Sequence, residues 1–250
     1  MRLRNFLLIL CLCLASVSCK RTYQKSLETG GFIITDEQIT PDSSIAAYIQ
    51  PFKEKLEAKM NREIGQAAQP LPKKKDISEW ESSLGNFVAD LILMEAQKAT
   101  KTTIDMGVIT FGGLRTSLPA GAIQVRHIYE LMPFENELLV IHVNASTVKQ
   151  LFDYFVSRKN TAIANTKVYI TQNTLAEVLV DEKPLTDRTY TIAISDYLAN
   201  GGDDMHFLEE RSKTETLNIK LRDAIIQHIE GLQVKEEMIK VVAEKRVIVK

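Results

Sequence analysis

The chain has 250 residues, of which 45% are hydrophobic and 25% are charged, and its formal net charge is −1. This composition is typical of a globular protein that buries a sizeable core. The near-neutral charge gives no support to nucleic acid as a partner, because a face that binds nucleic acid needs clustered Lys and Arg.

The amino-terminal residues 1–18 predict a bacterial lipoprotein signal peptide. Two arginines precede an apolar run from Phe6 to Ala15, and that run is shorter than the roughly 20 residues of a membrane-spanning helix. Small residues then lead to Cys19, in a pattern that resembles the lipoprotein cleavage box. We expect a lipid on Cys19 and a polar tether over residues 19–41, in a protein exported to the periplasm or outer membrane. Simple secretion with a free cysteine is the alternative.

Residues 42–250 are expected to form one domain, since neither an internal repeat nor a second apolar span appears in them. Asp42 or Ser43 is expected to cap a first helix. Its apolar face, at spacings of three and four, consists of Ile45, Ile49, Phe52, Leu56, Met60 and Ile64. Pro51 is expected to bend or interrupt this helix. The Pro- and Lys-rich stretch 69–76 follows, and its run Lys73–Lys75 is interpreted as a solvated linker.

The remaining elements alternate between helical and strand patterns. Helices are predicted at 84–98, 148–156 and 214–230, the second of them capped by Asn144 or Ser146. Strands are predicted at 105–110, 138–143, 167–171, 176–180, 189–195 and 246–249. This mixture predicts an α+β or layered α/β fold.

Four segments need to be weighed together: 81-ESSLGNFVAD-90, 111-FGGLRTSLPAGAI-123, 131-LMPFENELL-139 and 197-YLANGGDDM-205. Each alone has an ordinary structural explanation. In this order and at these separations, they resemble the carboxy-terminal domain of the bacterial and animal 5'-nucleotidase family, over nearly all of residues 42–250. The resemblance implies mixed sheets flanked by helices in α/β/β/α layers.

In that family this domain holds the nucleoside end of a nucleotide, and a separate metallophosphatase domain cuts the phosphate. The resemblance makes Phe134 and Tyr197 the two aromatics that sandwich the base, although the second is normally phenylalanine. It makes Asp203 the acid that accepts from the ribose hydroxyls, and Arg115 an arginine on the substrate side. Thr110 and Ser78, with Asp204, depart from the asparagine, arginine and glycine of the family pattern.

The chemistry of these residue types suits those roles. Every base has a π-face, so two facing aromatics grip it with about 1–3 kcal/mol per stacked base. A carboxylate accepts from both ribose hydroxyls, and arginine offers a planar fork to phosphate or carbonyl oxygens. Gly201 and Gly202 allow close backbone approach or positive φ. The alternatives are that Phe134 and Tyr197 are core aromatics and that Asp203 only shapes a turn.

No catalytic residue and no metal ligand is expected in this chain. A two-metal phosphoesterase needs Asp, His and Asn in segments such as Asp-x-His. The four histidines, at 127, 142, 206 and 228, lie in no such segment. Divalent metals are therefore expected only in a separately encoded metallophosphatase subunit, with which this chain would act in nucleotide hydrolysis. The alternatives are a stand-alone nucleoside-binding or nucleotide-binding lipoprotein, and a scaffold that has lost ligand binding.

Overall fold

The computed structural model describes residues 40–240 and 245–250. The predicted signal peptide, Cys19 and all but the end of the predicted tether lie outside the described residues. The chain divides into two compact units, residues 1–48 and 49–250. Within the described part, no helix is both long and apolar enough to span a membrane.

Helix α2 (Ser43–Met60) begins where the sequence predicts. The carboxylate of Asp42 accepts hydrogen bonds from the backbone N–H groups of Ser44 and Ile45, at 2.8 and 3.1 Å. The helix is assigned without a break through Pro51, and it has no buried residue. Ile64, expected on its apolar face, instead lies buried on strand β1 (Glu63–Ala67).

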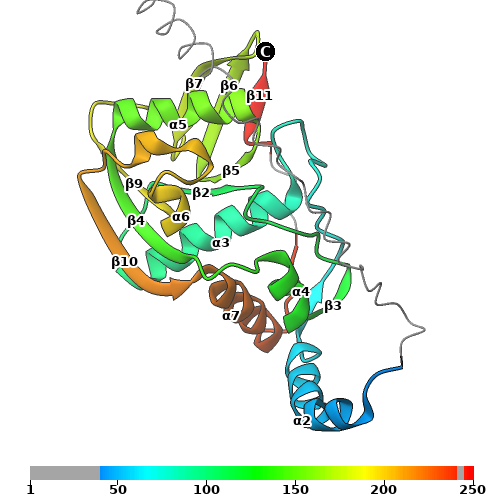
Figure 1. The fold of residues 1–250 in the computed structure, drawn as a ribbon. Coiled ribbons are helices and arrows are strands. Elements are labelled where there is room, and N and C mark those ends of the chain that lie inside the picture. Colours follow the sequence, from blue (N-terminus) through cyan, green and yellow to red (C-terminus); the bar gives the residue numbers. More distant parts are fainter. Residues whose placement is uncertain (1–39, 241–244) are drawn as a thin grey trace, which may run out of the picture. The chain divides into compact units, whose positions relative to one another are not determined.

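The larger unit is organised around a five-stranded mixed sheet in the order β10-β4-β9-β2-β5 (Figure 1). Its strands are β10 (Lys213–Lys220), β4 (Glu137–Asn144), β9 (Thr189–Ser195), β2 (Met106–Thr110) and β5 (Thr161–Ala164). Strands β2 and β9 are parallel, and the other neighbours are antiparallel. Successive side chains of a strand point to opposite faces, so Leu138 and Val140 enter one core while Leu139 and Ile141 enter another.

The first of these cores is covered by helices α3 (Ser83–Thr100) and α7 (Leu221–Val234). Ser82 caps α3 by accepting the backbone N–H of Gly85 at 3.0 Å. The two-stranded sheet of β1 and β3 (Gly121–Gln124) packs beside α7, together with helix α4 (Val125–Leu131). Residues of α3 and α7 share one hydrophobic cluster with this small sheet.

The second core lies on the other face of the sheet, against α5 (Ala145–Arg158) and a four-stranded sheet. That sheet has the order β11-β6-β7-β8 and comprises β11 (Val247–Val249), β6 (Thr166–Thr171), β7 (Thr174–Val180) and β8 (Lys183–Pro184). Asn144, one of the two predicted caps of α5, accepts the N–H of Thr147 at 2.8 Å. The predicted fold class, with mixed sheets and flanking helices, is confirmed.

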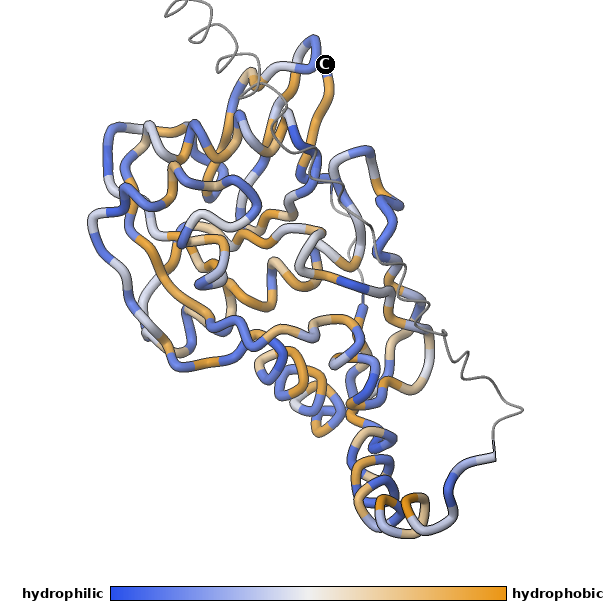
Figure 2. The backbone as a smooth tube through the Cα atoms, viewed as in Figure 1, coloured by the Kyte–Doolittle hydropathy of each residue, from blue (hydrophilic) through white to orange (hydrophobic). Residues whose placement is uncertain are grey.

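The prediction of a helix over residues 214–230 is wrong in its first half. Residues 213–220 form β10, an edge strand paired with β4, and α7 starts only at Leu221. Leu217 and Leu221 fit a helical spacing, but Leu217 and Ile219 also alternate as in a strand. Hydrogen bonds offered by the edge of β4 decide between these two patterns. Figure 2 shows that β4 is largely hydrophobic, whereas β10 carries more hydrophilic residues.

Candidate functional site

The candidate site lies where β2 and β9 end, since the carboxyl ends of two parallel strands meet at one edge of a sheet. The Gly112–Gly113 turn follows β2. Helix α6 (Asp196–Ala199) and the turn 202–204 follow β9. The loop that carries Phe134 enters β4 at the same edge, where the N–H of Glu137 donates to the Asp196 carboxylate at 3.1 Å.

Tyr197 and Asp203 are in direct contact. The Tyr197 hydroxyl lies 3.1 Å from Asp203 Oδ1, and the backbone N–H of Asp203 donates to the same hydroxyl at 3.3 Å. From α5, the Tyr154 hydroxyl donates to the carbonyl of Asp203 at 2.7 Å. Asp203 has a φ of 53°, in the left-handed region that Asp tolerates better than most residues.

The two glycines of this turn have separate structural reasons. Gly201 has a φ of 86°, which glycine adopts without a steric penalty. A Cβ atom on Gly202 would lie 2.5 Å from the carbonyl oxygen of Tyr197 and 2.6 Å from its ring. The Tyr197 ring therefore packs directly on the backbone of Gly202, and a side chain there would displace it.

The Gly112–Gly113 turn joins Asp203 to the arginine side of the site. A Cβ atom on Gly112 would lie 3.3 Å from Asp203 Oδ2, so this backbone passes close to the carboxylate. Arg115 donates from Nη1 to the Gly112 carbonyl at 3.3 Å, and its guanidinium carbon lies 6.0 Å from the centroid of the Phe134 ring. Contacts thus run from Phe134 through Arg115 and Gly112 to Asp203 and Tyr197.

The loop that carries Phe134 is anchored by charged residues that the sequence analysis did not single out. Glu135 pairs with Lys220 and with Arg222, whose guanidinium lies 4.2 Å from the centroid of the Tyr129 ring. The hydrogen bonds from Lys220, then Arg222, lower the pKa of Glu135 to about 2. Both partners fall in the region predicted as a continuous helix, so their position beside this loop was not apparent from the sequence.

Phe134 and Tyr197 are 39% and 50% exposed, so neither is a buried core aromatic. Of the three departures from the family pattern, Thr110 is buried on β2. The Ser78 hydroxyl donates to Glu81 at 3.3 Å. Asp204 has a φ of 65° and pairs with Arg158 at 3.0 Å. In the described part of the chain, none of these three side chains makes a hydrogen bond or ion pair with Phe134, Arg115, Tyr197 or Asp203.

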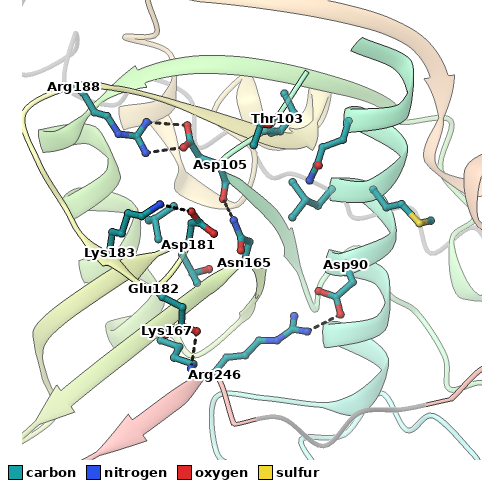
Figure 3. Close-up of a pocket in the computed structure, with 16 residues that line it drawn as sticks. Asp90, Thr103, Asp105, Asn165, Lys167, Asp181, Glu182, Lys183, Arg188 and Arg246 are labelled. Atoms are coloured by element: carbon teal, nitrogen blue, oxygen red, sulfur yellow. Dashed lines mark hydrogen bonds and ion pairs between the residues drawn. The ribbon is translucent and has the colours of Figure 1, made fainter. Parts of the chain in front are cut away.

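A separate pocket of about 660 Å³ lies near the amino ends of the same two strands (Figure 3). Asp105, just before β2, makes a two-point ion pair with Arg188 at 2.7 and 3.1 Å. It also accepts from the N–H and hydroxyl of Thr191, at 2.8 and 3.0 Å. Burial alone would raise the pKa of Asp105, but the hydrogen bonds from Arg188 and Thr191 outweigh it and hold the pKa below its usual value.

Across residues 40–240 and 245–250, no group of three or more His, Cys, Asp or Glu side chains is placed to hold a metal ion. His142 and His206 each contact a single glutamate, Glu215 and Glu209, at 2.7 Å. His127 accepts the N–H of Gln124 at 3.1 Å as part of the cap of α4. His228, predicted at the surface of its helix, is half-buried on α7 with its ring centroid 5.9 Å from that of Phe87.

Residues 63–210 match the family model of the 5'-nucleotidase C-terminal domain, which is more than half of the chain. These residues include all of the candidate site described above except Lys220 and Arg222. The chain therefore belongs to the 5'-nucleotidase C-terminal domain family.

Curated relatives include the trifunctional nucleotide phosphoesterase of Bacillus subtilis, which is 26% identical over 73% of this chain and 14% of its own length. The 5'-nucleotidase of Vibrio parahaemolyticus is 24% identical over 68% of this chain and 31% of its own length. Among solved structures, the 5'-nucleotidase precursor of Thermus thermophilus superposes with a TM-score of 0.70 at 23% identity, covering 82% of this chain and 42% of that one. This chain thus spans less than half of the length of each of these relatives.

Proposed function

We propose that this chain recognises the nucleoside part of a nucleotide and acts with a separate metallophosphatase chain in nucleotide hydrolysis. One observation carries the proposal: two exposed aromatics, an arginine and a carboxylate lie in one connected set of contacts at the carboxyl ends of β2 and β9. Two aromatic faces, a hydroxyl acceptor and a cationic fork are the groups that a base, a ribose and a phosphate require.

In the proposed complex, the base stacks between Phe134 and Tyr197. Asp203 accepts from the ribose hydroxyls, and Gly112 has no Cβ atom that would crowd Asp203 Oδ2. Arg115 donates toward the phosphate side. Gly201 and Gly202 shape the turn that holds Asp203 and Tyr197 together.

A titration calorimetry experiment with adenosine and AMP tests this site. The double variant Phe134→Ala with Tyr197→Ala should lose nucleoside binding, because each stacked face contributes about 1–3 kcal/mol. Asp203→Asn should weaken adenosine but have less effect on adenine alone, which has no ribose. If the double variant binds adenosine as tightly as the native chain, the base does not stack between Phe134 and Tyr197.

The hydrolytic step is proposed to occur on a partner chain that carries the divalent metals. Purification of the tagged native chain from its own cells should co-purify a metallophosphatase, and mixing the two should give metal-dependent release of phosphate from AMP. Phosphate release by this chain alone, after metal addition, would contradict the proposal that hydrolysis occurs on a partner chain.

The proposed location is the periplasm or the outer membrane of a bacterium, with a lipid on Cys19. Cys19→Ala should abolish incorporation of labelled fatty acid and release the protein from membranes. Export without a lipid on Cys19 would leave the native chain unlabelled and would support simple secretion instead.

A specific contact favours a second candidate, a scaffold that has lost ligand binding. The Tyr197 hydroxyl already occupies one oxygen of Asp203, the group proposed to take the ribose. Under that candidate, neither adenosine nor AMP binds to the native chain, and Tyr197→Phe does not restore binding.

A further inference from the structure

The segment that contains Lys73–Lys75, interpreted from the sequence as a solvated linker, is exposed at Lys74 and Lys75 but is also held in place by hydrogen bonds. Leu71 and Leu118 exchange two backbone hydrogen bonds of 3.0 Å, and the N–H of Lys73 donates to the Ser117 hydroxyl at 2.8 Å. Arg115 lies only two residues before Ser117. The lysine run is therefore pinned to the loop that carries the candidate arginine.

These two segments enclose an open hollow of about 590 Å³. It is lined by the three lysines, Phe111, Arg115, Thr116 and Ser117. Within the described residues, none of these four cations has a carboxylate partner within 4.0 Å, whereas the nearby Lys159 pairs with Glu79. The hollow therefore concentrates positive charge that has no carboxylate partner among residues 40–240 and 245–250.

The environment of Lys75 agrees with a positive potential in the hollow. Its Nζ lies 6.0 Å from the centroid of the Phe111 ring. Partial burial, followed by repulsion from Lys159, lowers the pKa of Lys75, although Glu79 opposes the shift. An anion in the hollow would offset the repulsion from Lys159, because it adds negative charge beside the ammonium group of Lys75.

We propose that this hollow binds the phosphate chain of the nucleotide, so that the preferred ligand is a nucleoside carrying two or more phosphates. The inference rests on the proposed nucleoside site, with which it shares Arg115. A single phosphate carries about −1.5 to −2 charges at pH 7, fewer than three lysines and one arginine can neutralise. Lysines act as point charges on phosphate, and the arginine adds a two-point fork.

The test compares adenosine, AMP, ADP and inorganic pyrophosphate as ligands of the full chain in titration calorimetry. We expect ADP to bind more tightly than AMP and at least about tenfold more tightly than adenosine, with a strong decrease as salt is raised. The combined variant Lys73→Gln, Lys74→Gln and Lys75→Gln should lose this gain and bind adenosine as before. The matched control removes the same charge from the exposed face of α2, by Lys53→Gln, Lys55→Gln and Lys59→Gln, and should bind ADP like the native chain.

The outcomes separate this inference from the proposed function. If adenosine binds but ADP binds no more tightly, or the triple lysine variant keeps the gain, the phosphate site is wrong and the nucleoside site stands. If adenosine does not bind while pyrophosphate binds and is lost in the triple variant, the anion site stands and the nucleoside proposal fails. If the α2 control variant also loses affinity for ADP, the loss reflects the net charge of the chain, and the inference is overturned.

Discussion

The two ends of the parallel strands β2 and β9 differ in how completely their cations are paired with carboxylates. Around the pocket at their amino ends, opposite charges neutralise each other in four ion pairs of 2.6–2.7 Å. These pairs are Asp90 with Arg246, Asp105 with Arg188, Lys167 with Glu182, and Lys183 with Asp181. At their carboxyl ends, Arg115 and the three lysines have no carboxylate partner in the described part of the chain. Paired charges hold elements together, whereas a cluster of unpaired cations has its charge available for a ligand.

The largest effect is expected at the paired end. Asp105→Asn removes the negative charge that Arg188 and Thr191 surround, on a side chain that is 19% exposed. We expect a loss of about 2–3 kcal/mol in the free energy of unfolding, measured by urea denaturation, because the charge-assisted hydrogen bonds from Arg188 and Thr191 are weakened or lost. Nucleoside affinity should not change.

Asp181→Asn is the matched control in the same pocket. Its carboxylate pairs with Lys183, but it is 64% exposed, so we expect a loss below about 1 kcal/mol. Equal losses in the two variants would show that the Asp105–Arg188 pair does not organise this pocket.

At the carboxyl end, Gly202→Ala should weaken adenosine binding by about tenfold or more. The added methyl group would overlap the ring and carbonyl of Tyr197, so the proposed stacking face must move. Gly231→Ala is the control, since a Cβ there meets nothing within 4 Å and lies within helix α7. It should leave binding unchanged and raise the melting temperature slightly. Unaltered binding by Gly202→Ala would remove Tyr197 from the site.

A smaller effect of opposite sign is expected for Tyr197→Phe. The hydroxyl that occupies Asp203 Oδ1 is removed while the aromatic face remains. Since one hydrogen bond contributes about 0.5–1.5 kcal/mol, adenosine affinity should rise about two- to tenfold in calorimetry. A decrease would instead assign the hydroxyl itself a contact with the ligand.

The smallest effect is expected on stability at low pH, through the carboxyl group of Glu135. The pKa of Glu135 is about 2 in the fold, below its ordinary value of 4.5. Its contribution to stability is therefore complete above pH 4.5 and is lost as the pH falls from 4.5 toward 2. A carbon-detected NMR titration should show this carboxyl titrating near pH 2, and Lys220→Gln should raise its pKa. An unchanged pKa in that variant would mean that Lys220 does not anchor the loop of Phe134.

Local sequence patterns predicted those helices and strands whose type depends only on the residues within the element. Asn144 caps α5 as predicted, and β9 occupies the predicted residues 189–195. In contrast, residues 213–220 have two possible periodicities, and only the hydrogen-bonding edge of β4 makes them a strand. The error also hid Lys220 and Arg222, since a local pattern does not encode which distant loop a residue will contact.

By itself, the sequence determined the family, the mixed fold and the segments in which an aromatic pair, a carboxylate and an arginine are found. Those segments carry short motifs, and a motif is a property of neighbouring residues along the chain. Only the tertiary structure decided that Gly112 lies against Asp203, that Glu135 is held by Lys220 and Arg222, and that the lysine run borders Arg115. These contacts join residues far apart in sequence, and they form because β2, β4 and β9 bring their loops to one edge of a sheet.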